Sequence, residues 1–212
     1  MRLTDKLPET VTIGGVEVPI NSDFRTSVSF SMMIYDPDLS DEEKILKGLE
    51  MYYPTRDRDI YDIEEAVTQM LWFFRCGDTS EVKGSGDKTR AYDFDVDADS
   101  IFASFLMQYG IDLSTVNLHW WKFMAMLTNL KEDVPLAKIM TYRVIDTKGM
   151  DKEQAKFYKK MKRIYRLEDR VSETDEKLQQ EIEQALIDGG DPSEIIERYK
   201  QRQVAQNEET KM

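Results

Sequence analysis

The sequence predicts a mainly α protein: a compact domain of about seven helices, preceded by a small N-terminal β-hairpin and followed by an acidic helical tail. Two observations carry this prediction. After Asn21, apolar residues recur at helical spacing, and most of these stretches begin with a capping residue or end at a glycine. Residues 11–20 differ, because two short β-branched runs there flank a pair of glycines.

The hairpin is expected in "VTIGGVEVPI", where Gly14 and Gly15 supply a tight turn. Pro19 has no backbone N–H to donate, so it restricts the second strand to an edge position or an early end. We therefore predict three parts: residues 1–20 form a hairpin packed on the core, residues 21–170 a helical domain, and residues 171–212 an acidic, partly helical or flexible tail.

Two helices are expected next, and each is preceded by polar residues that can cap its N-terminus. The first follows "NSD" at residues 21–23, and the second follows Ser40 with acidic residues in its first turn. On the first helix, the predicted buried face is Phe24, Val28, Met32 and Tyr35. On the second helix, it is Ile45, Leu46, Leu49 and Tyr52.

The remaining helices follow the same reasoning. A third is expected from about Asp62 to Cys76, with Gly77 in position to end it. The polar, glycine-bearing stretch 78–93 then predicts a long loop. Helices resume in "DADSIFASFLMQYG", closed by Gly110, and in "STVNLHWWKFMAMLTNL", "PLAKIMTYRVID" and "MDKEQAKFYKKMKRIYRL".

Composition narrows the classes of protein that need considering. The formal net charge of −12 argues against general nucleic-acid binding, since phosphate backbones are held mainly by Lys and Arg. The single cysteine, Cys76, excludes an internal disulfide framework and a thiolate zinc cluster. The chain shows neither a signal peptide nor a long uncharged apolar run, so we expect a soluble cytoplasmic protein without a membrane partner.

The stretch "KGSGDKTRAYDFDVDAD" suggests a phosphate-binding loop followed by a calcium-binding run of alternating aspartates, here called the acidic ladder. Neither pattern is complete. No glycine precedes Lys88 at the positions a phosphate loop requires. The alternating Asp93, Asp95, Asp97 and Asp99 lack the glycine and the closing glutamate of a calcium loop. We expect instead a solvated turn, then an extended segment with Phe94 and Val96 on one side and an aspartate capping the next helix.

No catalytic constellation is apparent. His119 is the only histidine, and no Ser or Cys nucleophile has a recognisable setting beside it. We interpret it as a partly buried polar residue and Cys76 as a packed structural thiol. The sequence therefore predicts no catalytic, cofactor-binding or metal-binding residue, no cofactor, and no enzymatic activity.

Two features stand out as candidates for interaction with another protein. The runs "MLWFF" and "HWWKF" are apolar on more than one helical face, which is more than a single small core requires. Two interpretations stay open: these residues fill the core alone, or they fill the core and also provide a surface for self-association or a helical partner. The candidate partner-binding residues are Trp72, Phe73, Trp120, Trp121 and Phe123.

The second feature is charge segregation. A basic helix precedes an acidic tail, and its candidate interface residues are Lys156, Lys159, Lys160 and Arg163. Three interpretations stay open at this point: a solvated face, docking of the acidic tail from the same or a neighbouring subunit, and nucleic-acid binding, which the net charge disfavours.

Three blocks together resemble the gene-product-fifteen family of long-tailed phages of Gram-positive bacteria, over Val18 to Leu167. The blocks are "VPINSDFRTSVSF", "MLWFFRCG" and "YDFDVDADSIFASFLMQYGIDL...LHWWKFMAMLTNL...PLAKIMTYRVID". Genes of that family usually lie between those for the major tail protein and the tape-measure protein. The resemblance thus implies a tail assembly chaperone, a small helical protein that coats the hydrophobic tape measure.

On this reading the expected partners are the tape-measure protein and further copies of the chain, with tail-tube subunits as an additional candidate. The protein would act in the host cytoplasm during assembly and be absent from the mature virion. Twelve methionines suit adaptable apolar contacts. The alternatives are a structural virion component, such as a connector or tail-associated subunit, and, less favoured, a nucleic-acid-binding regulator.

Overall fold

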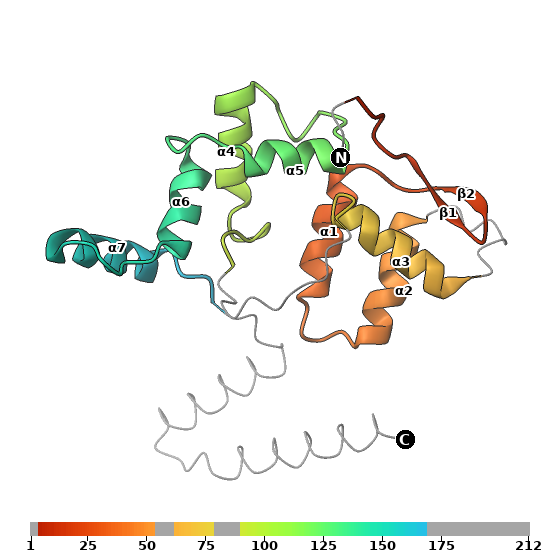
Figure 1. The fold of residues 1–212 in the computed structure, drawn as a ribbon, viewed down its shortest axis with the longest axis horizontal. Coiled ribbons are helices and arrows are strands. Elements are labelled where there is room, and N and C mark those ends of the chain that lie inside the picture. Colours follow the sequence, from red (N-terminus) through yellow and green to blue (C-terminus); the bar gives the residue numbers. More distant parts are fainter. Residues whose placement is uncertain (1–3, 54–61, 79–89, 169–212) are drawn as a thin grey trace, which may run out of the picture. The chain divides into compact units, whose positions relative to one another are not determined.

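The computed structural model describes residues 4–53, 62–78 and 90–168. Within them it contains one two-stranded antiparallel sheet and seven helices, as the sequence predicts, and all of these elements belong to one packed unit (Figure 1). The acidic tail and the glycine-bearing stretch 79–89 lie outside the described residues. The predictions made for those two segments therefore stay predictions.

The hairpin forms where it is expected. Strands β1 (Thr10–Ile13) and β2 (Val16–Pro19) pair with Ile13 opposite Val16, which leaves Gly14 and Gly15 as a two-residue turn. Both glycines have positive φ, 60° and 79°, as the hairpin turn requires. β1 packs on α3 (Ile63–Phe74), and its alternate residues Val11 and Ile13 are buried, so the hairpin is part of the core.

Helices α1 (Phe24–Ile34) and α2 (Asp41–Tyr52) occupy the predicted ranges but present different faces to the core. On α1, the buried residues are Phe24, Ser27 and Phe30, whereas Tyr35 is exposed. On α2, Gly48 and Tyr52 are buried, while Ile45 and Leu46 face outward. The predicted faces of both helices were therefore wrong in part.

The reason is a close polar and aromatic contact between these two helices. The Tyr52 hydroxyl donates a hydrogen bond to Ser27 Oγ at 2.7 Å, and the Phe30 and Tyr52 rings meet edge to face. Gly48 has no side chain to separate α2 from Phe30. A hydrophobicity pattern assigns neither a serine nor a glycine to a core, so the two contact residues escaped prediction.

The third helix, α3, begins at the Asp62 cap, whose carboxylate accepts a hydrogen bond from Glu65 N at 2.9 Å. It ends in a Schellman motif: Gly77 N donates to Trp72 O and Cys76 N donates to Phe73 O. The residue at the usual glycine position of this motif is Cys76, with φ of 56°, and Gly77 follows with φ of 79°. The helix therefore ends at Phe74, two residues before the predicted end at Cys76, because Cys76 already takes the left-handed conformation expected of Gly77.

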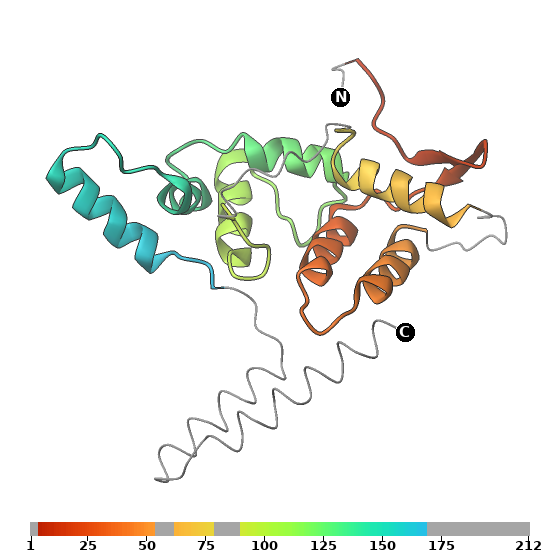
Figure 2. The same cartoon turned by 60° about the horizontal axis from the view of Figure 1, so that its bottom comes forward.

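The second half of the unit is a series of four helices, α4 (Ala98–Tyr109), α5 (Trp120–Thr128), α6 (Pro135–Val144) and α7 (Lys152–Ile164). The helix α5 packs on α1 and on α4, α6 packs on α4, and α7 packs on α6. Figures 1 and 2 both show α6 between α4 and α7. Gly110, with φ of 66°, ends α4 as predicted.

Candidate functional site

Four of the five predicted partner-binding residues are core residues. The exposed fractions of Phe73, Trp120, Trp121 and Phe123 are 0%, 2%, 6% and 1%. These four side chains offer no surface to a partner in this structure, which corrects the expectation drawn from their abundance. The helix α5 is apolar on several faces because it contacts α1 and α4 and its two tryptophans reach the end of α3.

The tandem tryptophans have a structural role at the end of α3. Trp120 Nε1 donates to Phe74 O and Trp121 Nε1 donates to Phe73 O, both at 2.8 Å. These carbonyls belong to the last turn of α3, where the helix supplies no N–H four residues on, although Phe73 O also accepts from Cys76 N. The two indoles therefore cap α3 from a distant segment while their rings fill the core.

Phe123 lies at the centre of an aromatic cluster. Its ring stacks on Phe24 at 4.8 Å, on Phe105 at 4.9 Å and on Trp120 at 5.7 Å between centroids. Through this cluster, residues of α1, α4 and α5 share one core. Each such aromatic pair contributes about 0.5–1.5 kcal/mol beyond the area it buries.

Trp72 is the one residue of the five that is only half-buried. Its ring meets Trp121 edge to face, with centroids 5.4 Å apart. Part of this indole therefore remains available to a partner, and Trp72 is retained as a candidate contact.

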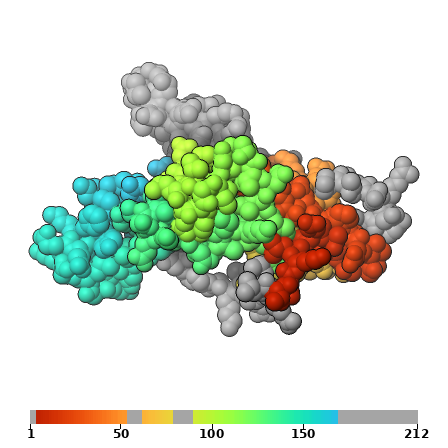
Figure 3. Space-filling model, turned by 90° about the horizontal axis from the view of Figure 1, so that it is seen from above, coloured from red at the N-terminus to blue at the C-terminus, as the bar shows by residue number. Residues whose placement is uncertain are grey.

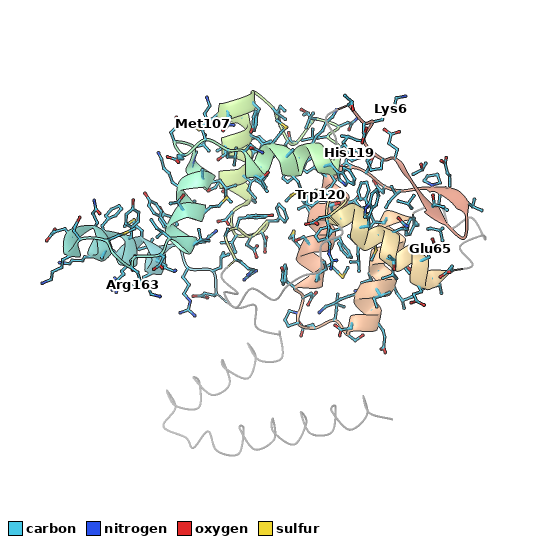
Figure 4. The ribbon with its side chains drawn as sticks, in the orientation of Figure 1. Lys6, Glu65, Met107, His119, Trp120 and Arg163 are labelled. Carbon is cyan, nitrogen blue, oxygen red and sulfur yellow. The ribbon has the colours of Figure 1, made fainter. Side chains whose placement is uncertain are left out.

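His119 is a helix cap. Its Nδ1 accepts a hydrogen bond from Trp121 N at 3.0 Å, and its Nε2 lies 2.9 Å from Pro8 O, an arrangement in which Nε2 carries the proton. Its ring meets Phe73 edge to face. Both ring nitrogens are thus engaged with backbone, in line with the interpretation of His119 as a partly buried polar residue. Figure 4 shows it at the start of α5, next to Trp120.

Cys76 is a structural thiol. Burial raises the pKa of Cys76 to about 11, because the thiolate loses hydration there. The thiol is therefore protonated at neutral pH and a poor nucleophile.

The acidic ladder is divided between the core and the surface. Asp93 and Asp97 are buried, with exposed fractions of 5% and 4%, whereas Asp95 and Asp99 are exposed. The segment before α4 is a turn, and Val96 is 70% exposed, so the predicted extended segment with Phe94 and Val96 on one side was wrong. Phe94 alone turns inward, against Trp120.

The buried carboxylates are neutralised by two arginines. Asp97 accepts a forked pair of hydrogen bonds from Arg143, at 2.5 and 2.9 Å, and Asp93 pairs with Arg90 at 2.7 Å. Arg143 also donates to Ala91 O and Tyr165 O, at 3.1 and 2.6 Å. This network joins the turn at residues 90–97, α6 and the end of α7, and its charge-paired carboxylates have a structural explanation without a metal.

The predicted charged interface on α7 is exposed. Lys156, Lys159, Lys160 and Arg163 all lie at the surface, together with Phe157 at 49% and Ile164 at 55% exposure. Tyr142 of α6 packs against Tyr158 and Tyr165, and its ring also meets that of Phe157 edge to face, so Phe157 lies at the border between the packed and the exposed side of α7. Figure 4 marks Arg163 on α7.

The structure reveals a second outward face that the sequence did not identify. On α4, Ile101, Ser104 and Phe105 point into the core, and Phe102, Leu106 and Met107 are 37%, 47% and 68% exposed. Residues of α4, yellow-green in Figure 3, form part of the surface seen from above. The signal was present in the sequence as a helix apolar on two faces, but which face was free depended on the packing of α5 and α6.

Within residues 4–53, 62–78 and 90–168, no group of three or more His, Cys, Asp or Glu side chains is placed to hold a metal ion. Among the helices of that same part of the chain, none is long and apolar enough to span a bilayer.

Comparison with known proteins identifies a family for this chain. A family model described as "Bacteriophage Gp15 protein" matches residues 3–167, most of the chain and nearly the same range as the resemblance seen in the sequence. Neither the curated proteins nor the solved structures contain a significant match.

Proposed function

This chain belongs to the bacteriophage Gp15 family, and on that premise we propose that it is a tail assembly chaperone. In this proposal it self-associates and binds the hydrophobic tape-measure protein while the phage tail is built. It acts in the host cytoplasm, it is absent from the mature virion, and it catalyses no reaction.

Family membership over residues 3–167 is the observation that carries the proposal. In the family that this sequence resembles, the gene usually lies between those for the major tail protein and the tape-measure protein. A role for this chain in tail assembly is therefore expected. A tape-measure protein is a long helical chain with apolar stripes. Such a chain needs a soluble covering until the tail tube forms around it.

The surface of the described unit supports this proposal, because it keeps many large apolar side chains exposed. The exposed ones are Val16, Tyr35, Ile45, Leu46, Ile63, Val96, Phe102, Leu106, Met107, Val144, Phe157 and Ile164. Exposed apolar residues that share a helix face provide the kind of surface an amphipathic partner helix binds. The net charge of −12 favours solubility of a particle coated with many copies.

We assign the first contact with the client to α2. Ile45 and Leu46 are adjacent on α2 and are 41% and 56% exposed, and Leu46 lies on the side of the helix away from Gly48 and Tyr52. The neighbouring helix α3 carries the half-buried Trp72. Each contact is expected to be modest, with affinity arising from many copies along one client, so that tube subunits can displace the coat.

The test is co-expression with the tape-measure protein encoded downstream, followed by measurement of the size and mass of whatever stays soluble. The expected result is a soluble complex with many copies of this chain per tape measure. Leu46→Lys should recover less soluble tape measure, because it places a charge in the apolar contact. Val16→Lys is the matched control, since Val16 on the hairpin is 58% exposed and Leu46 is 56% exposed.

A tape measure that precipitates alone while this chain elutes unchanged would contradict the proposal. Detection of the chain in purified virions at a fixed copy number would favour a structural component of the tail instead. Salt-sensitive DNA binding that is lost in Lys156→Glu would favour a nucleic-acid-binding regulator.

A further inference from the structure

We propose that copies of this chain assemble head to tail, with the outer face of α4 on one copy packed against the outer face of α7 on the next. The inference rests on the self-association within the proposed function and names the two surfaces that would produce it. It follows from two exposed helix faces of one chain that are both apolar but opposite in charge.

The α4 face consists of Asp99, Phe102, Leu106 and Met107, with Asp95 just before the helix. Asp99, Phe102 and Leu106 are spaced three and four residues apart, so they lie along one side of the helix. All of these side chains are exposed. The helix contains no Lys or Arg, and the two carboxylates at its start therefore set the sign of this face.

The α7 face consists of Lys156, Phe157, Lys160, Arg163 and Ile164. Phe157 and Ile164 are seven residues apart and lie next to the row formed by the three cations, so apolar and basic side chains share one side of the helix. Lys156, Phe157, Lys160 and Arg163 line one open surface hollow. The helix carries six basic residues and one acidic residue.

Charge decides which pairing of these faces is favoured. Two α7 faces would bring rows of like charge together, and two α4 faces would do the same with carboxylates. An α4 face against an α7 face joins opposite charges and buries Phe102 and Leu106 against Phe157 and Ile164. The second copy of the chain is thus the occupant that both faces suit.

Such an interface is heterologous, because it uses a different patch on each copy. Each added copy leaves one α4 face and one α7 face free, so assembly continues until a ring closes or a filament forms. A continuing assembly of this kind suits a protein that covers a long client with repeated units.

The test uses one variant for each face in the full chain. Leu106→Lys places a cation where the cationic α7 of the next copy must bind. Lys156→Glu with Lys160→Glu reverses the charge of the α7 face. Sedimentation velocity over a range of concentrations should show wild-type assemblies larger than a dimer, and each variant should weaken self-association by at least about tenfold. Circular dichroism verifies that both variants, which change exposed positions, keep the helical fold.

Mixing the two variants gives the decisive result. The Leu106→Lys chain keeps an intact α7 face and the lysine-reversed chain keeps an intact α4 face, so the equimolar mixture should associate at concentrations where neither variant does so alone. Val16→Lys on the hairpin, where Val16 is 58% exposed compared with 47% for Leu106, is the control and should assemble like the wild type. A mixture that stays monomeric, or variants that assemble like the wild type, would overturn the inference.

The same samples separate this inference from the proposed function. If the wild type is monomeric yet keeps the tape measure soluble, the proposed interface is refuted and the chaperone function is supported. If the wild type assembles as described but the tape measure stays insoluble, the interface is supported and the proposed chaperone function is refuted. A monomeric wild type that binds a DNA duplex through the α7 lysines assigns that face to nucleic acid and overturns the inference.

Discussion

Replacing Arg143 with methionine would break the buried network that connects the turn at residues 90–97 with α6 and α7. Arg143 is 4% exposed and donates four hydrogen bonds, two to Asp97 and one each to the carbonyls of Ala91 and Tyr165. Methionine has a comparable length but no donors. The substitution therefore leaves the Asp97 carboxylate buried without its cation, although Asp93 N still donates to it at 2.9 Å.

The expected loss is large relative to the stability of a domain of this size. Removing one partner of a buried ion pair costs about 3–5 kcal/mol, because the remaining charge is neither hydrated nor paired. A typical domain has about 5–15 kcal/mol in total. The Arg143→Lys variant keeps the positive charge but not the planar fork, so its loss should be smaller and still exceed about 1 kcal/mol.

The assay is urea unfolding followed by tryptophan fluorescence, which the buried Trp120 and Trp121 make sensitive to loss of the core. The double variant Asp97→Asn with Arg143→Met removes the orphaned charge. It should cost less than the sum of the two single changes by about 1.5–3 kcal/mol. A single Arg143→Met loss below about 1 kcal/mol, or simple additivity of the two changes, would refute this account of the network.

Three further predictions concern close packing, backbone strain and pH. Gly48→Ala places a methyl group 2.7 Å from Phe30 Cε2. This crowding should outweigh the better helix propensity of alanine and lower the free energy of unfolding in urea by about 1–2 kcal/mol. An unchanged urea midpoint would contradict this prediction. Cys76→Gly should be about 1 kcal/mol more stable than the matched Cys76→Ala, because only glycine takes the left-handed conformation without strain; equal stabilities would exclude strain there. Burial raises the pKa of Tyr52 and of Tyr53 above the ordinary value, so the unfolded chain releases these protons at lower pH than the folded chain. The unfolding temperature should therefore fall as the pH rises above about 10. Tyr53→Phe should make this fall less steep, and an unchanged dependence of unfolding temperature on pH would count against the prediction.

Several features could be predicted because they depend on a few neighbouring residues. The hairpin follows from two glycines between β-branched runs, since the turn needs positive φ at both central positions. The starts of α1, α3 and α7 follow from Asp23, Asp62 and Asp151, each of which accepts a hydrogen bond from a backbone N–H of the first turn. The exposed basic side of α7 was also visible in the sequence, because charged side chains rarely enter a core unpaired.

The candidate site was less predictable, since the abundance of aromatic residues does not show which of them are buried. The amino-acid sequence by itself determined the hairpin and the starts of α1, α3 and α7, because capping and turn geometry are settled within a single turn of chain. Only the tertiary structure decided that Trp120 and Trp121 bind the end of α3, that Arg143 pairs with Asp97 46 residues away, and that the outer face of α4 stays uncovered. Each of these contacts depends on which segments pack together across the core. Whether a side chain is buried is therefore decided by packing between distant segments and not by the sequence of one helix.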